Sequence, residues 1–149
     1  MNDLRLDGWE CLRVRDVEST RRGSHERFAQ KVLRLGAAPP RVSLGSTRAL
    51  VESLPPRRLV VVECEADDDF LLGRILGFDD RFVDVHSIDA SGRWAGHATR
   101  VSLEEITRLQ FGDHYSRSFE RHGAKWRAPR SAPAIAPDFS CSTRPRSRE

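Results

Sequence analysis

Residues 70–89, FLLGRILGFDDRFVDVHSID, constrain the fold of this chain more than any other stretch. Two runs rich in leucine, β-branched and aromatic residues flank the acidic pair Asp79 and Asp80, a pattern typical of two strands joined by a tight turn. Gly73 lies inside the first run, where a glycine permits a strand to bend sharply. The stretch therefore predicts a bent β-hairpin.

The length and the cysteine content limit what the chain can be. Its 149 residues have room for one domain, or for one and a small part of another. No apolar run approaches the roughly 18–20 residues that span a bilayer, and the charged N-terminus is unlike a signal peptide. The three cysteines lie far apart and form no CxxC pair. We expect a cytoplasmic protein with no membrane contact.

The positive charge is confined to the C-terminal tail. Residues 127–149 contain five arginines and two acidic residues, which accounts for the whole net charge of +3. The preceding 126 residues are neutral, with 20 basic and 20 acidic side chains. A nucleic-acid-binding domain usually has a basic face, and the composition gives no support for one.

The sequence on either side of the hairpin predicts further short strands and helices. Hydrophobic alternation and N-cap residues mark them. Strands are expected within residues 4–21 and over residues 58–65, 94–103 and 106–111. Helices are expected over residues 25–35, 47–54 and 114–123, after the N-caps Ser24, Ser46 and Asp113.

A weak internal repeat relates the two ends of the chain. Both residues 6–36 and residues 88–123 follow the order glycine turn, strand, tight acidic turn, strand, glycine and helix. Residues 1–36 therefore read as a partial repeat, followed by a linker over residues 37–45. The main domain spans residues 46–126, and residues 127–149 read as a disordered basic tail rich in proline and arginine. Because the first repeat lacks a hairpin, we expect strands to be missing before Met1.

The segment GRILGFDDRF, residues 73–82, resembles the first Sm motif of Sm-like proteins of the LSm and Hfq type. Gly73, Phe78 and Asp79 are the fold-determining residues of that motif, and the resemblance covers about residues 46–111. It implies a mainly β fold with flanking helices, namely an Sm-like five-stranded bent barrel, here preceded by a partial, half-barrel repeat. It also implies oligomers that assemble through edge strands.

This chain departs from the Sm pattern where that family contacts RNA. Val83 occupies the place of the base-contacting asparagine. The last turn carries Glu104 and Glu105 where the family has Arg-Gly. Acidic side chains at that turn would repel phosphate groups. The resemblance therefore implies the fold more strongly than it implies RNA binding.

Few residues indicate a chemical site. No motif for a nucleophile elbow, a phosphate loop or a dinucleotide fold is present, and Cys64 lies between two glutamates that would raise its pKa. No set of histidines and cysteines has metal-ligand spacing. We therefore expect no enzyme, no cofactor, no metal and no catalytic residue.

Four residues remain as candidates for contacting a ligand or partner. The alternative for each is a packing or solvated side chain, such as a core tryptophan or a histidine at a helix start. The candidates are Trp94, His97, His114 and Arg81. The leading hypothesis is a non-enzymatic interaction module that binds itself or a protein partner through edge strands. The alternative is an RNA-binding Sm-like protein.

Overall fold

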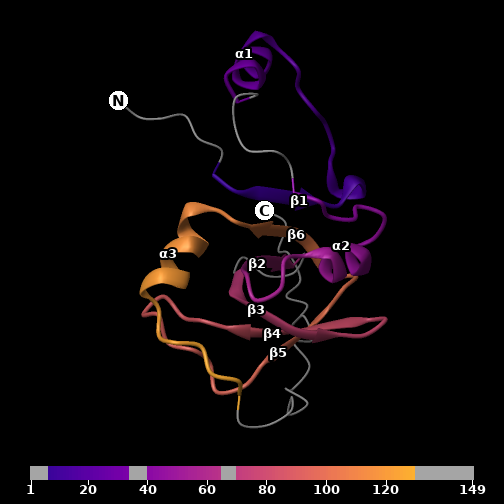
Figure 1. Cartoon of the computed structure of the whole chain (residues 1–149). Helices are drawn as coiled ribbons and strands as arrows, with labels where there is room; N and C mark the ends of the chain where they lie inside the picture. Colours follow the sequence, from indigo (N-terminus) through magenta and orange to yellow (C-terminus); the bar gives the residue numbers. More distant parts are fainter. Residues whose placement is uncertain (1–6, 34–39, 65–69, 130–149) are drawn as a thin grey trace, which may run out of the picture.

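The computed structural model describes residues 7–33, 40–64 and 70–129 (Figure 1). The strands are β1 (Trp9–Leu12), β2 (Leu59–Cys64), β3 (Phe70–Phe78), β4 (Phe82–Ser87), β5 (Thr99–Ser102) and β6 (Ile106–Phe111). The helices are α1 (Ser24–Leu33), α2 (Thr47–Ser53) and α3 (His114–His122), with a short 3₁₀ turn, η1 (Val14–Asp16). The prediction of a mainly β fold with a few short helices is confirmed.

All six strands belong to one antiparallel sheet in the order β1-β6-β2-β3-β4-β5. The sheet is open, with β1 at one edge and β5 at the other (Figure 1). A closed five-stranded barrel is not confirmed. The chain therefore presents two edge strands, whose outer backbone groups have no strand partner within the described ranges.

The central strand β2 is buried on both faces, as its unbroken run of aliphatic residues predicts. Val60 and Val62 belong to a large core cluster with β4, β5, β6 and the buried Leu50 and Val51 of α2. Leu59 and Val61 belong to a smaller cluster on the opposite face, against which Phe119 of α3 packs. Helices α2 and α3 thus cover different faces of the sheet.

The predicted hairpin is formed by β3 and β4. Asp79 makes the turn, because its carboxylate accepts hydrogen bonds from the backbone N–H groups of Arg81 and Phe82, both at 2.8 Å. These two N–H groups hold the pKa of Asp79 below its ordinary value. At Gly73 an added Cβ would lie 2.4 Å from the backbone oxygen of His86. The glycine is therefore required by the close approach of β3 to β4.

Two predicted helix caps are confirmed. The Ser46 hydroxyl accepts a hydrogen bond from the Ala49 N–H at 3.1 Å at the start of α2. Asp113 accepts one from the Ser116 N–H at 2.7 Å at the start of α3, and its side chain is buried. These caps satisfy N–H groups that the first helical turn leaves free.

Two strand predictions are wrong in their extent. The strand expected over residues 94–103 begins at Thr99, because Trp94 makes only an isolated bridge with Ile88 and the intervening chain forms a loop. The strand expected within residues 4–21 is limited to β1 and is followed by η1. Only the part of each segment that lies beside a partner strand forms a ladder.

Some predictions fall on residues outside the described ranges. These are the helix end expected near Gly36, residues 37–39 of the linker expected over residues 37–45, and the basic tail from residue 130. Residues 40–45 contain no helix or strand. Among the described residues, no helix is long and apolar enough to cross a membrane.

Candidate functional site

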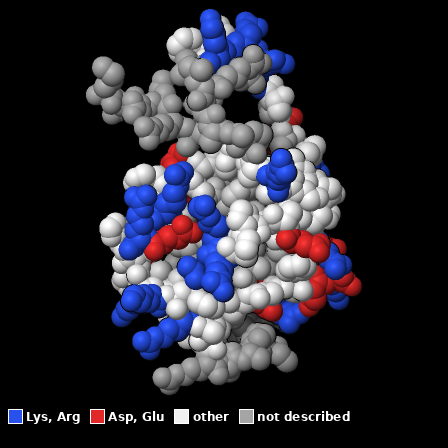
Figure 2. Space-filling view, in the orientation of Figure 1, with Lys and Arg blue, Asp and Glu red and all other residues white. Residues whose placement is uncertain are grey.

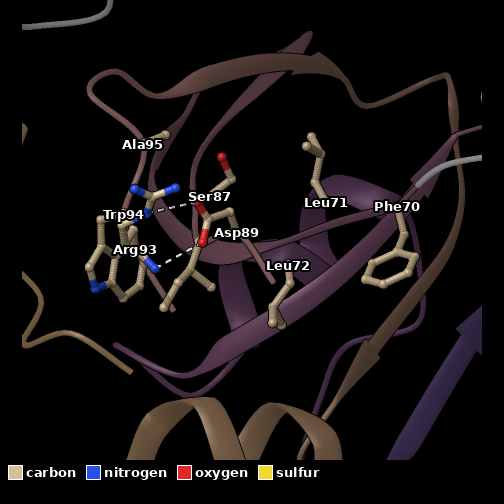
Figure 3. Close-up of a pocket in the computed structure, with 9 residues that line it drawn as sticks. Phe70, Leu71, Leu72, Ser87, Asp89, Arg93, Trp94 and Ala95 are labelled. Atoms are coloured by element: carbon tan, nitrogen blue, oxygen red, sulfur yellow. Dashed lines mark hydrogen bonds and ion pairs between the residues drawn. The ribbon is translucent and has the colours of Figure 1, made fainter. Parts of the chain in front are cut away.

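A groove of about 340 Å³ opens beside Trp94, where β3 extends past the end of β4 (Figure 3). Leucine, isoleucine and aromatic side chains form most of its walls. Its lining residues are Phe70, Leu71, Leu72, Ser87, Ile88, Asp89, Arg93, Trp94 and Ala95. The groove lies next to the smaller core cluster, to which Leu72 and Ile88 belong.

The groove exists because the chain turns away from β3 after Ser87. The turn is organised by Asp89, whose carboxylate accepts hydrogen bonds from the backbone N–H groups of Ser91 at 2.8 Å and Arg93 at 3.0 Å. The Ser91 hydroxyl, followed by the Arg93 N–H, holds the pKa of Asp89 below its ordinary value. Gly92 completes the turn with a φ of +77°. This turn brings Arg93 and Trp94 back over the groove.

The backbone of β3 is open toward the groove. On the side of β3 that faces β4, the last hydrogen bond runs from the Ile88 N–H to the Leu72 oxygen, at 2.8 Å. Because backbone groups alternate between the two sides of a strand, Phe70 directs its N–H and C=O to the same side as Leu72. Within the described ranges no strand lies there to receive them. An extended segment could add beside residues 70–72.

An aromatic row joins the groove to α3. The ring of Phe70 lies edge-on to Tyr115, with centroids 6.3 Å apart, and Tyr115 lies 4.9 Å from Phe119. Phe70 and Tyr115 both remain exposed, at 47% and 45%. Such exposed rings beside a groove provide apolar area for a partner to cover.

A polar and aromatic cluster adjoins the groove and shares Trp94 with it. The Arg74 guanidinium lies between two indole rings, 5.5 Å from the centroid of Trp94 and 5.3 Å from that of Trp126. The ring of His86 lies 5.1 Å from Trp94 and accepts a hydrogen bond from the Trp126 indole at 3.1 Å. The cluster thus contains residues of β3, β4, the 88–98 loop and the segment after α3.

The structure does not bring the four predicted contact residues together. Trp94 lines the groove, whereas Arg81 lies in the hairpin turn at the other end of β3 and β4. His97 is exposed in the loop before β5, and His114 is the exposed first residue of α3. Of the four, only Trp94 belongs to the groove.

The acidic hairpin turn is largely neutralised by neighbouring arginines. Asp79 forms an ion pair with Arg100 of β5, and Asp80 forms one with Arg48 of α2. Arg81 lies over the ring of Phe82, with its guanidinium 5.5 Å from the centroid. Exposed pairs of this kind contribute little stability, but they leave few free charges at the turn.

Two observations among the described residues bear on metal binding and on thiol reactivity. Within the ranges that the structure describes, no group of three or more His, Cys, Asp and Glu side chains could hold a metal ion. Burial, with a smaller contribution from the charge of Glu10, raises the pKa of the Cys11 thiol. A raised pKa disfavours the thiolate that a nucleophile requires.

The sequence reasoning missed most of the groove and the cluster around Arg74. The groove depends on where β4 ends relative to β3, which is a matter of register rather than of residue type. The register at the hairpin turn alone would place Arg74 opposite Ser87, and an irregularity between Ile75 and Gly77 shifts it to His86. No protein-family model, no curated protein and no solved structure matches this chain.

Proposed function

We propose that this protein is a non-enzymatic interaction module that adds an extended strand, from a second copy or from another protein, to the open edges of its sheet. The observation that carries the proposal is the open backbone of Phe70 beside an apolar groove. Main-chain hydrogen bonds would supply affinity there, and the groove would select the side chains of the added strand.

The edge strand β5 is a second place for strand addition. The Leu103 N–H bonds inward to the Arg81 oxygen at 2.8 Å, so alternation directs the N–H and C=O of Arg100 and the N–H of Ser102 outward, while the Ser102 oxygen accepts the Glu105 N–H at 3.1 Å. No strand of the described ranges pairs with that side. The strand is short, which limits the number of bonds that it can offer.

The architecture behind these edges would be that of an Sm-like barrel preceded by a partial repeat. Two features support this part of the proposal. Helix α2 is followed by the five strands β2 to β6, and Gly73, Phe78 and Asp79 occupy the bent strand and the turn that the motif requires. In proteins of that type the edge strands mediate assembly, which agrees with the proposed role of β5.

Proline scanning of the open edges tests the proposal. Phe70→Pro and Arg100→Pro each remove an outward N–H without touching a ladder bond, and Phe70→Ala and Arg100→Ala are the matched controls that keep it. Light scattering at several protein concentrations measures self-association, and titration with strand-forming peptides measures capture. We expect a proline at the functional edge to weaken association about tenfold relative to its alanine control, which corresponds to about 1.4 kcal/mol.

Two outcomes would contradict the proposal. One is a strict monomer that captures no extended peptide at any concentration tested. The other is association that is unchanged by both proline variants, since an interface elsewhere would then be responsible.

RNA binding is the second candidate, and one surface favours it. In the view of Figure 2, Lys and Arg side chains gather over the side of the molecule that holds α3. Exposed cations with no carboxylate partner among the described residues include Arg57, Arg58, Arg121 and Lys125. A neutral composition can conceal such a gathering of cations, and unpaired cations can contact phosphate groups.

Arg57 provides a clean test of the RNA candidate. Its φ of 66° lies in the left-handed region, which favours glycine over arginine. Arg57→Gly therefore removes a charge while stabilising the fold by about 1 kcal/mol. If this surface binds RNA, the variant loses affinity for a random RNA pool and shows a weaker salt dependence, although its fold is more stable. Binding that is lost only on deletion of residues 128–149 would locate it in the tail instead.

A further inference from the structure

The segment after α3 is attached to the 88–98 loop and to β4 by three hydrogen bonds. The Ala124 N–H bonds to the Gly92 oxygen at 2.9 Å, and the Trp94 indole donates to the Ala124 oxygen at 2.8 Å. The third bond runs from the Trp126 indole to Nδ1 of His86, at 3.1 Å. The first two bonds involve only groups whose protonation does not change with pH. The acceptor of the third bond is the imidazole of His86, which can take up a proton.

The partners of His86 determine its protonation state. An indole N–H can only donate, so Nδ1 of His86 must be an unprotonated acceptor. A backbone carbonyl can only accept, so Nε2, which lies 2.8 Å from the Ala95 oxygen, must carry the hydrogen. His86 is therefore neutral, in the Nε2–H form, for as long as both bonds exist. Its side chain is only 1% exposed, so water cannot replace either partner without movement.

Protonation of His86 is incompatible with the bond to Trp126. A proton added at Nδ1 would point at the indole N–H, and two donors would then face each other. The new positive charge would also lie close to the Arg74 guanidinium, since Arg74 is the cross-strand neighbour of His86. Separation of Trp126 from His86 relieves the first conflict, because the added proton then no longer faces a donor.

The other charged groups around His86 do not reverse this conclusion. Asp84 lies two residues earlier on β4 and would favour a cation, but Arg74 is directly opposite and of like charge. Lys125 and Arg127 flank Trp126, and His97 lies two residues beyond Ala95, so these neighbours add only positive or titratable groups. In the adjoining turn, Asp89 and Arg93 form an ion pair with 3.5 Å between Oδ2 and Nε, so their charges offset each other.

We propose that His86 and Trp126 form a pH-sensitive latch, closed while the imidazole is neutral and opened by its protonation. Opening separates the Trp126 ring from His86 and from the Arg74 guanidinium, while the two bonds at Ala124 do not depend on pH. The Arg74 guanidinium also lies against Trp94, so the latch would change the support of one wall of the groove. The latch itself does not depend on the proposed function, because it concerns contacts within one chain.

Fluorine NMR of protein labelled with 5-fluorotryptophan tests the latch. The three tryptophans give three resonances, which Trp126→Phe and Trp94→Phe assign. As the pH is lowered from about 8 while circular dichroism shows the protein folded, we expect the Trp126 resonance to move to that of an exposed indole while the Trp9 resonance stays. Below the midpoint of this change, each further drop of one pH unit lowers the ratio of latched to open protein about tenfold.

His86→Asn is the matched control. Its side-chain oxygen lies near the place of Nδ1 and can accept from Trp126, but it does not titrate. The variant should keep the latched Trp126 resonance throughout the same pH range. A shift that persists in His86→Asn, or a wild-type Trp126 resonance that does not move while circular dichroism shows the protein folded, would overturn the proposal.

Nitrogen NMR of the wild-type histidines keeps the test decisive if the variant does not fold. At about pH 8 His86 should show an unprotonated Nδ1 and a protonated Nε2. Its titration should coincide with the movement of Trp126. An Nδ1–H tautomer at that pH, or a titration of His86 that leaves Trp126 in place, contradicts the latch.

Discussion

The two halves of the internal repeat form the same local structure in very different surroundings. Each begins at a glycine with positive φ, Gly8 at +83° and Gly92 at +77°. Each has a strand followed by a tight turn closed by the same bond, Asp16 N–H to Arg13 oxygen at 3.0 Å and Glu105 N–H to Ser102 oxygen at 3.1 Å. Each ends in a helix, α1 or α3. The same turn bond thus recurs in the two segments that the sequence relates, and the repeat itself stays a prediction.

The halves differ in burial. In the C-terminal half, β6 buries Ile106, Leu109 and Phe111. In the N-terminal half none of the described side chains is buried, and Val14 and Phe28 are 87% and 66% exposed. Residues 17–22, which follow the turn as β6 follows its own, form no strand. Turns and helix starts therefore depend on neighbouring residues. A strand also requires a partner, and among the described strands β2 and β4 pair with those of the C-terminal half but with none of the N-terminal half.

The largest expected effect is a difference in stability between a substitution in β6 and one opposite it in β1. Leu109 is 1% exposed between β1 and β2, and Leu109→Ala should lower the free energy of unfolding by about 3–4 kcal/mol through the cavity that it leaves. Cys11 lies directly opposite on β1 and is only half-buried, so Cys11→Ala should cost less than about 1 kcal/mol. Urea unfolding of both variants measures the difference. Equal costs would show that β1 is as much a part of the core as β6.

The next largest effect is a difference between substitutions at the starts of α3 and α1. Asp113→Ala removes two bonds to Ser116 from a buried carboxylate and should cost about 2 kcal/mol. Ser24→Ala at the start of α1 should leave global stability within about 0.5 kcal/mol, because α1 packs no buried residue among those described. Thermal unfolding of the two variants is the measurement. A large loss in Ser24→Ala would contradict the contrast.

A smaller effect measures how firmly the N-terminal half is attached. A Cβ at Gly8 would lie 2.6 Å from the backbone nitrogen of Asp113, so Gly8→Ala must push β1 away from α3. The loss in free energy of unfolding should not exceed about 1–2 kcal/mol, because the rest of the fold can remain while β1 detaches. Hydrogen exchange should then rise in β1 and stay slow in β6. Faster exchange in both strands would show that they unfold as one unit.

The sequence predicted those parts of the molecule that depend on neighbouring residues. The hairpin is an example, because Asp79 bonds to N–H groups only two and three residues away. The strand expected from Trp94 failed, because the indole is held by Ala124, 30 residues away. The groove was not predicted for the same reason: it depends on where β4 leaves β3. Contacts distant in sequence have no local signature, and both the groove and the His86 cluster consist of such contacts.

The smallest expected effect is also the one that most sharpens the comparison. Phe28 of α1 is exposed, whereas Phe119 of α3 packs against the cluster that contains Leu59 and Leu72. Phe28→Ala should therefore change the free energy of unfolding by less than about 0.5 kcal/mol, while Phe119→Ala should cost about 2 kcal/mol or more. Denaturant unfolding at low and high protein concentration measures both variants. A loss for Phe28→Ala only at high concentration would mean that a second copy covers α1, and a loss at every concentration would mean that α1 is packed within its own chain.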